Sequence, residues 1–184
     1  MTKTKRISAI ISSILAFSTV NVLSASASTT WNSVIVDNDT IASGCSNSGS
    51  SSLYAYKTGS NLYNSDARYV YTSSQSTRYR WTFPPKRNWS AQYFSARVYM
   101  YLNDSVFTDP YALYGVEHGT YGNTATVGTI DQDSAPSGWN SVYKSSIHSE
   151  SLGGGFYIQS AVMSPSGDSS KGTGADAIQV QIIY

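Results

Sequence analysis

The sequence predicts an all-β protein, and three observations support this prediction. Hydrophobic residues recur with a period of two along most of the chain, which is the spacing of a half-buried strand. Clusters of Gly, Pro, Asn, Asp and Ser separate these stretches at intervals that suit connecting turns. Beyond the N-terminal region, no window has the i, i+3, i+4, i+7 pattern of an amphipathic helix. Such strands form a sandwich or a barrel, because each sheet must bury its apolar face.

About eight or nine strands are expected, in stretches rich in Tyr, Val, Thr and Ile. The clearest alternation places Val98, Met100 and Leu102 on one face of a strand and Tyr99 and Tyr101 on the other. The two tyrosines are therefore expected to point outward. The expected strands occupy 33–37, 67–72, 77–83, 94–102, 111–118, 123–130, 139–147, 156–163 and 177–184.

Residues 1–27 have the three parts of a secretory signal peptide. Three positive charges in the first six residues precede an apolar stretch over 7–23, and Ala25-Ser26-Ala27 supplies the small residues of a cleavage site. The alternative, a membrane anchor, needs about 20 consecutive apolar residues, and this stretch is shorter and interrupted by polar residues. We therefore expect residues 28–184 to be secreted as one domain, with no membrane insertion.

Composition limits the classes of function. The whole chain has a net charge of +1 and only 12% charged residues, so it has no strongly basic surface for nucleic acid or an anionic membrane. Its 15 tyrosines favour a rigid β protein over a disordered chain. The single cysteine, Cys45, cannot form an internal disulfide, so it is either an unpaired loop thiol or the site of an intermolecular disulfide.

Four segments together resemble the golvesin / xanthan-lyase carbohydrate-binding-like domain family. They are Val36-Asp37-Asn38-Asp39 near the start, the stretch 114–132, the turn Ser137-Gly138-Trp139, and Gly174-Ala175-Asp176-Ala177-Ile178 before the last strand. The resemblance covers most of 28–184. It implies a single antiparallel β-sandwich of the jelly-roll, galactose-binding-like type, with a role in binding carbohydrate.

The chain departs from the family pattern at two places, which indicates a distant or specialised member. Val142-Tyr143 follows Trp139 where the family favours Leu-Gly, and Ile178-Gln179 stands where it favours Val-Arg. The family's domains usually accompany a catalytic domain, and this sequence shows none.

Recognisable catalytic motifs are missing from the sequence. His118 and His148 are the only histidines, and neither has a partner at zinc-ligand spacing. There is no Gly-x-Ser-x-Gly nucleophile elbow. A carboxylate pair for glycoside cleavage could include Glu117, but sequence does not give the separation of such a pair. We expect a protein that is not an enzyme, in which Glu117 and His118 are candidate ligand-binding residues.

Three carboxylates near the ends of the domain are candidate metal ligands. Asp37 and Asp39 follow the first expected strand, and Asp176 precedes the last. If the terminal strands lie together, these side chains could supply part of the six to eight oxygen ligands of a structural calcium ion. The alternative is ordinary turn chemistry, in which Asp side chains cap the ends of strands.

Sugar binding requires flat aromatic faces with a few polar groups beside them. Trp89 lies in a turn-like segment after two prolines, and Tyr121 lies in a turn flanked by glycines. With the outward-facing Tyr99 and Tyr101, they are the candidate ligand-binding aromatics. The tryptophans expected in the core are Trp81 and Trp139.

The function expected from these observations is a secreted, non-catalytic module that binds carbohydrate, such as a polysaccharide or a cell-wall glycan of the cell envelope. The alternative is an extracellular structural protein of a matrix or spore surface, in which the sandwich associates with copies of itself. Tyrosine-rich, weakly charged surfaces suit both.

Overall fold

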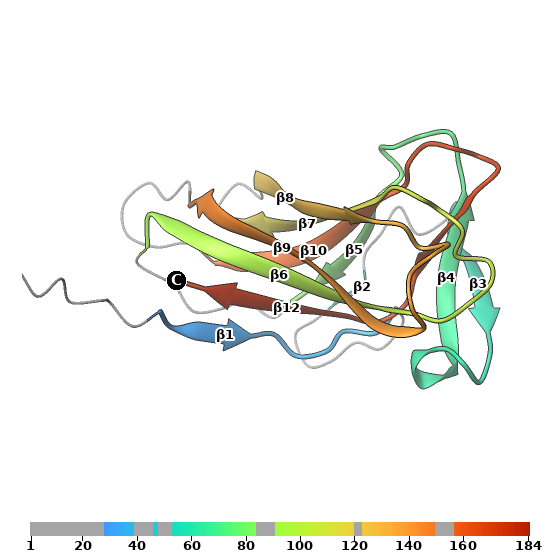
Figure 1. The fold of residues 1–184 in the computed structure, drawn as a ribbon, viewed down its shortest axis with the longest axis horizontal. Helices are drawn as coiled ribbons and strands as arrows, with labels where there is room; N and C mark the ends of the chain where they lie inside the picture. Colours follow the sequence, from blue (N-terminus) through green and yellow to red (C-terminus); the bar gives the residue numbers. More distant parts are fainter. Residues whose placement is uncertain (1–27, 39–45, 48–52, 84–90, 120–122, 150–156) are drawn as a thin grey trace, which may run out of the picture.

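The computed structural model describes residues 28–38, 46–47, 53–83, 91–119, 123–149 and 157–184. They form three antiparallel sheets that pack as a β-sandwich (Figure 1). The first sheet has the order β1-β12-β6-β9 and the second β2-β5-β10-β7-β8, and a smaller sheet has the order β11-β4-β3. The predicted all-β antiparallel sandwich is therefore confirmed. The strands are β1 Thr30–Asn32, β2 Ser46–Asn47, β3 Ala55–Thr58, β4 Asp66–Tyr71, β5 Tyr79–Thr82, β6 Tyr93–Leu102, β7 Ala112–His118, β8 Asn123–Ile130, β9 Gly138–His148, β10 Ile158–Ser164, β11 Gly172–Ala175 and β12 Ile178–Ile183.

The core lies between the first two sheets and follows the alternation of the sequence. Along β6 every second residue from Phe94 to Leu102 is buried, while Tyr99 and Tyr101 are half-buried on the outer face. This confirms the expected outward direction of the two tyrosines. Trp81 of β5 is 1% exposed and its indole N–H donates to the Asp176 carbonyl at 2.9 Å, as burial of an indole requires.

The small sheet lies across one end of the sandwich, where β3 and β4 run across the direction of the other strands (Figure 1). Its strand β11 passes so close to Phe107 that a Cβ on Gly174 would lie 2.0 Å from the ring. Glycine is therefore required there by close packing, and this explains why a Gly-rich segment forms a strand.

The expected set of strands differs from the structure in two ways. The segment expected as a strand at 33–37 makes only one bridge, between Val36 and Ile178, and the first strand instead precedes it at Thr30–Asn32. The sequence reading also missed the short strands β2, β3 and β11. In the described part of the chain, no helix is long and apolar enough to cross a membrane.

Candidate functional site

Three aromatic rings gather at the outer face of the first sheet; we call Tyr63, Tyr101 and Trp139 the aromatic platform. Trp139 is exposed, and Tyr63 and Tyr101 are half-buried. Their ring centroids are 5.7 Å apart for Tyr63 and Tyr101, 5.7 Å for Tyr63 and Trp139, and 5.6 Å for Tyr101 and Trp139. All three pairs meet edge to face, an arrangement that holds each ring in place. The platform is therefore preorganised without being buried.

Three different elements bring these rings together. Tyr101 of β6 pairs directly with Trp139 of β9, so their side chains emerge on the same face. β9 begins at Gly138, whose φ of 104° is a left-handed conformation that glycine adopts without strain. Tyr63 comes from the short 3-10 turn η2, Tyr63–Ser65, in which Asn64 also has a positive φ, of 48°.

Trp139 was expected in the core, and this expectation was wrong: it is 42% exposed. β9 is the edge strand of its sheet, and nearly all of its residues are exposed or half-buried. The pairing with Tyr101 places Trp139 on the outer face, where a large apolar ring is available to a ligand.

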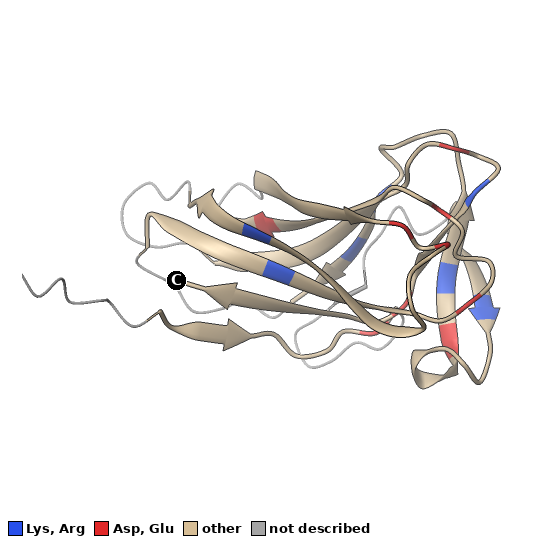
Figure 2. Ribbon diagram, viewed as in Figure 1, with Lys and Arg blue, Asp and Glu red and all other residues tan. Residues whose placement is uncertain are grey.

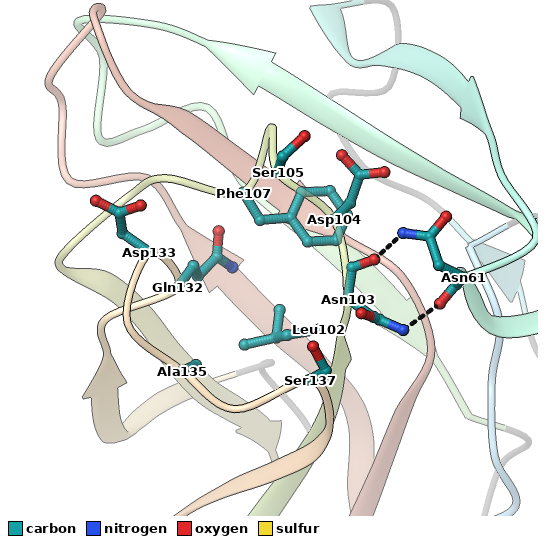
Figure 3. Close-up of a pocket in the computed structure, with 10 residues that line it drawn as sticks. All are labelled: Asn61, Leu102, Asn103, Asp104, Ser105, Phe107, Gln132, Asp133, Ala135 and Ser137. Atoms are coloured by element: carbon teal, nitrogen blue, oxygen red, sulfur yellow. Dashed lines mark hydrogen bonds between the residues drawn. The ribbon is translucent and has the colours of Figure 1, made fainter.

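A polar pocket of about 480 Å³, the end pocket, lies beside the platform (Figure 3). The same three segments build both, because Asn61, Asn103 and Ser137 of the pocket are each two residues from a platform ring. Figure 3 shows the polar side chains of Asn61, Asn103, Asp104 and Asp133 around the apolar Leu102 and Phe107. Its lining residues are Asn61, Leu102, Asn103, Asp104, Ser105, Phe107, Gln132, Asp133, Ala135 and Ser137.

Hydrogen bonds hold the walls of the end pocket. The Asn61 side chain donates to the Asn103 carbonyl, and the Asn103 side chain donates to the Asn61 carbonyl at 2.8 Å. The buried Gln132 donates to the Tyr114 hydroxyl at 2.8 Å and to the Gly174 carbonyl at 3.0 Å, and accepts from the Gly174 N–H at 2.8 Å. The pocket can therefore keep its shape when a ligand enters.

An acidic cluster accepts hydrogen bonds from η2; we use this name for Asp37, Asp66 and Asp176. The Tyr63 N–H donates to Asp176 Oδ2 at 3.1 Å and the Asn64 amide donates to Asp37 Oδ2 at 2.7 Å. The Asn38 amide donates to Asp66 Oδ1 at 2.7 Å. The structure thus brings together Asp37 and Asp176, as the sequence suggested, and adds Asp66, which sequence reasoning missed. Figure 2 shows that acidic residues gather at this end of the molecule.

Burial and mutual repulsion disfavour the ionised forms of Asp37 and Asp176 in the acidic cluster. Burial raises the pKa of Asp176 to about 8, and the negative charges of Asp37 and Asp66 add to this effect. Burial also raises the pKa of Asp37, against the lowering effect of its hydrogen bonds from Asn38 and Asn64. Asp176 is 2% exposed and its Oδ1 has no hydrogen-bond partner among the described residues. Carboxylate oxygens of this kind suit calcium chemically. However, no group of three His, Cys, Asp or Glu side chains in the described ranges is arranged to hold a metal ion.

Glu117 and His118 lie in the second sheet, away from the platform. The buried Glu117 accepts from Arg80 Nη2 at 2.7 Å and from the Ser160 hydroxyl. The buried His118 packs edge to face on the core residue Phe94, with centroids 5.3 Å apart. Both side chains therefore make buried contacts within the protein that stabilise the second sheet and the core.

The remaining candidates divide into described and undescribed residues. Tyr99 lies on the same outer face as the platform, paired with Ser141 and Gln179. Trp89, Tyr121 and Asp39 lie outside the described residues, and so does Cys45.

The fold and the aromatic platform define a β-sandwich domain with a candidate site on its surface. No protein-family model matches the chain, and no curated protein matches its sequence. Among solved structures, it is similar to a xanthan lyase from Paenibacillus, with 19% identity, a TM-score of 0.47, and coverage of 81% of this chain and 13% of the lyase chain. The chain thus spans only a small part of that lyase.

Two further solved structures are similar to the chain. One is the cleaved adhesin domain of Lys-gingipain from Porphyromonas gingivalis, with 11% identity, a TM-score of 0.40, and coverage of 85% of this chain and 98% of that domain. The other contains the CBM22-1 and GH10 modules of an endo-1,4-β-D-xylanase from Clostridium thermocellum, complexed with xylohexaose. Its identity is 12% and its TM-score 0.42, with coverage of 83% of this chain and 28% of that one.

Proposed function

We propose that this protein is a non-catalytic module that binds a polysaccharide or cell-wall glycan on the aromatic platform. The observation that carries the proposal is the set of three mutually packed rings, in which Trp139 is exposed and Tyr63 and Tyr101 are half-buried. The C–H face of a pyranose packs on such rings, and their fixed geometry reduces the entropy lost on binding.

The end pocket supports the proposal because it supplies polar partners next to the rings. Sugar hydroxyls need donors and acceptors with fixed positions, and the amides, hydroxyls and carboxylates of Asn61, Asn103, Ser105, Asp133 and Ser137 can serve. A glycan chain that packs one residue on Trp139 would place its neighbour over this pocket.

The finer parts of the proposal come from the sequence. The signal-like segment 1–27 supports secretion, and the four-segment pattern supports distant membership of the golvesin / xanthan-lyase carbohydrate-binding-like family. The missing catalytic motifs support action by binding alone. A structural calcium ion at the acidic cluster is also part of the proposal, with Asp176 Oδ1, which has no hydrogen-bond partner among the described residues, as one ligand. Because the described carboxylates are not arranged to hold a metal ion by themselves, such an ion would also need ligands from backbone carbonyls or water.

The test compares Trp139→Ala with Tyr143→Ala for retention on insoluble polysaccharides and on purified cell walls. Tyr143 is a matched control, because it is exposed on the same face of β9 but packs against Arg97 outside the platform. We expect the loss of Trp139 to weaken binding by about tenfold, or about 1.4 kcal/mol, and the loss of Tyr143 to change it little.

Two outcomes would contradict the proposal. One is a wild-type protein that no glycan or cell wall depletes but that forms concentration-dependent oligomers, which would support the structural alternative. The other is glycan retention that Trp139→Ala leaves unchanged, which would remove the platform as the site.

A further inference from the structure

A second pocket, of about 430 Å³, lies at the end of the second sheet; we call it the Arg78 pocket. Its apolar surface comes from Tyr111, Leu113 and Pro165, and Tyr111 is 69% exposed. Its rim is polar and includes one charged residue, Arg78, which is exposed. Its lining residues are Gln75, Arg78, Tyr111, Leu113, Thr129, Ser164, Pro165 and Ser166.

The Arg78 guanidinium is available to a ligand. The ion pairs of the described residues use Lys57, Arg80 and Lys171, and Arg78 has no hydrogen bond or ion pair with any described residue. No carboxylate is among the residues that line this pocket. A guanidinium and an aromatic ring that line the same pocket suit a ligand that carries an anionic group on a flat apolar face.

The walls of this pocket are fixed from behind. The buried Asp109 accepts from the Tyr111 N–H at 2.9 Å and from the Ser166 N–H at 2.8 Å, which joins two walls through one side chain. The Gln75 amide donates to the Ser166 carbonyl at 2.7 Å. Asp109 also accepts from the Thr173 hydroxyl, so three donors compensate its negative charge. The walls of the Arg78 pocket are therefore preorganised in the absence of a ligand.

The two pockets lie at the same end of the sandwich. Thr129 of the Arg78 pocket pairs with Leu113 near the end of β8, and Gln132 of the end pocket follows three residues later in the chain. A ligand that approaches this end of the molecule can therefore reach either pocket.

We propose that the Arg78 pocket binds the anionic group of an acidic sugar, with the guanidinium of Arg78 holding the carboxylate or sulfate and the Tyr111 ring lying under the pyranose. The choice of a sugar rests on the proposed glycan-binding function, while the choice of an anion rests on this pocket alone. The protein would then select acidic over neutral glycans, and salt would weaken that selectivity.

The experiment measures the affinity of the protein by calorimetry at low ionic strength for two pairs of oligosaccharides. They are oligogalacturonate with its methyl-esterified neutral form, and a sulfated galactan oligosaccharide with its desulfated form. We expect at least one anionic oligosaccharide to bind about tenfold more tightly than its neutral counterpart, as one charge-assisted hydrogen bond allows. The anion that binds more tightly distinguishes a carboxylate from a sulfate.

Arg78→Gln is expected to abolish this tenfold preference while leaving affinity for the neutral oligosaccharide unchanged. Lys144→Gln is the control, because it removes the same charge from an exposed residue of β9 outside both pockets. Circular dichroism and thermal melting of each variant show that the fold is retained.

Three results would overturn the inference. The first is equal affinity for the anionic and neutral forms of every oligosaccharide. The second is an anion preference that Arg78→Gln retains, or that Lys144→Gln loses to the same extent, and the third is binding of a peptide carboxylate through Arg78 by a protein that binds no anionic sugar. The proposed function fails separately, when Trp139→Ala leaves neutral glycan binding intact. Anion binding that depends on Arg78 but not on Trp139 would support the Arg78 pocket, and the neutral glycan measurement then decides separately for or against the platform.

Discussion

Tyr101 of β6 and Trp139 of β9 face each other across neighbouring strands, with ring centroids 5.6 Å apart and ring planes inclined at 78°. Both rings also contact Tyr63, so each ring is fixed by the other two. The contact between Tyr101 and Trp139 joins two neighbouring strands, and the contacts of Tyr63 join both strands to the turn η2. Together they give the exposed Trp139 a defined orientation.

The packing of Tyr101 predicts that its ring matters for binding and its hydroxyl does not. Tyr101→Ala should weaken glycan binding by about three- to tenfold, because an aromatic pair contributes about 0.5–1.5 kcal/mol to holding its partner. Tyr101→Phe should bind like the wild type. Affinity electrophoresis of the two variants checks this, and a large loss in Tyr101→Phe would show that the hydroxyl itself contacts the sugar.

The raised pKa of Asp176 predicts that stability falls as pH rises. The pKa moves from 3.8 to about 8 on folding, so between about pH 4 and pH 8 the native state binds more protons than the unfolded state. Stability then decreases with pH across this window and levels off above it. Asp176→Asn removes the titrating group, so the variant should gain stability relative to the wild type from pH 5 to pH 8. Urea unfolding at both pH values measures this, and an equal difference at both would contradict the assignment.

A calcium ion at the acidic cluster would raise the melting temperature by mass action. A ligand that binds only the native state stabilises it by about 2.7 kcal/mol at a hundredfold excess over its Kd, which is several degrees for a domain of this size. Melting with millimolar calcium or with chelator measures the effect. Asp66→Asn should abolish it, whereas Asp168→Asn, an exposed aspartate outside the cluster, should not. Identical melting curves with calcium and with chelator would remove calcium from the proposal.

Gly174→Ala is expected to destabilise the fold. The added Cβ would lie 2.0 Å from Phe107, whose ring also lies below the end pocket, so either strand β11 or this ring must shift. Overpacking of this kind costs about 1–3 kcal/mol or more. Chemical denaturation measures the change, and a Gly174→Ala protein with wild-type stability would show that β11 moves freely.

Glu117→Gln should affect stability rather than glycan retention. The buried carboxylate accepts from Arg80 and Ser160 in the second sheet, and loss of a charged hydrogen bond there costs about 1–3 kcal/mol. Retention on polysaccharide should remain that of the wild type, because the platform belongs to the other sheet. Loss of retention in a folded Glu117→Gln protein would show that Glu117 contributes to glycan binding.

Long alternating strands were predictable because burial on one face leaves a clear period of two. β6 alternates over ten residues and was found with the correct faces. By contrast, β11 reads Gly-Thr-Gly-Ala, which has little intrinsic strand preference, and forms a strand because its glycines allow close packing on Phe107. Such a strand depends on a tertiary contact that local sequence does not show.

The candidate site was predictable only in part. Alternation placed Tyr101 on the outer face, but the edge strand β9 has no clearly apolar face, so its residue pattern does not indicate that Trp139 lies outside. Tyr63 was missed because its role depends on where η2 docks against β6 and β9. The turn-forming residues Asn64 and Ser65, followed by Asp66, were the signal in the sequence that could have drawn attention to this segment.

The pairing of β1 with β12 has a practical consequence for attachment. Thr29 and Tyr184 exchange backbone hydrogen bonds of 2.9 and 3.0 Å, so both ends of the described sandwich leave it side by side. Figure 1 shows this point at the opposite end of the molecule from β3 and β4. Immobilising the domain on a sensor, or fusing it to a reporter, through either end would leave the platform and both pockets facing the medium.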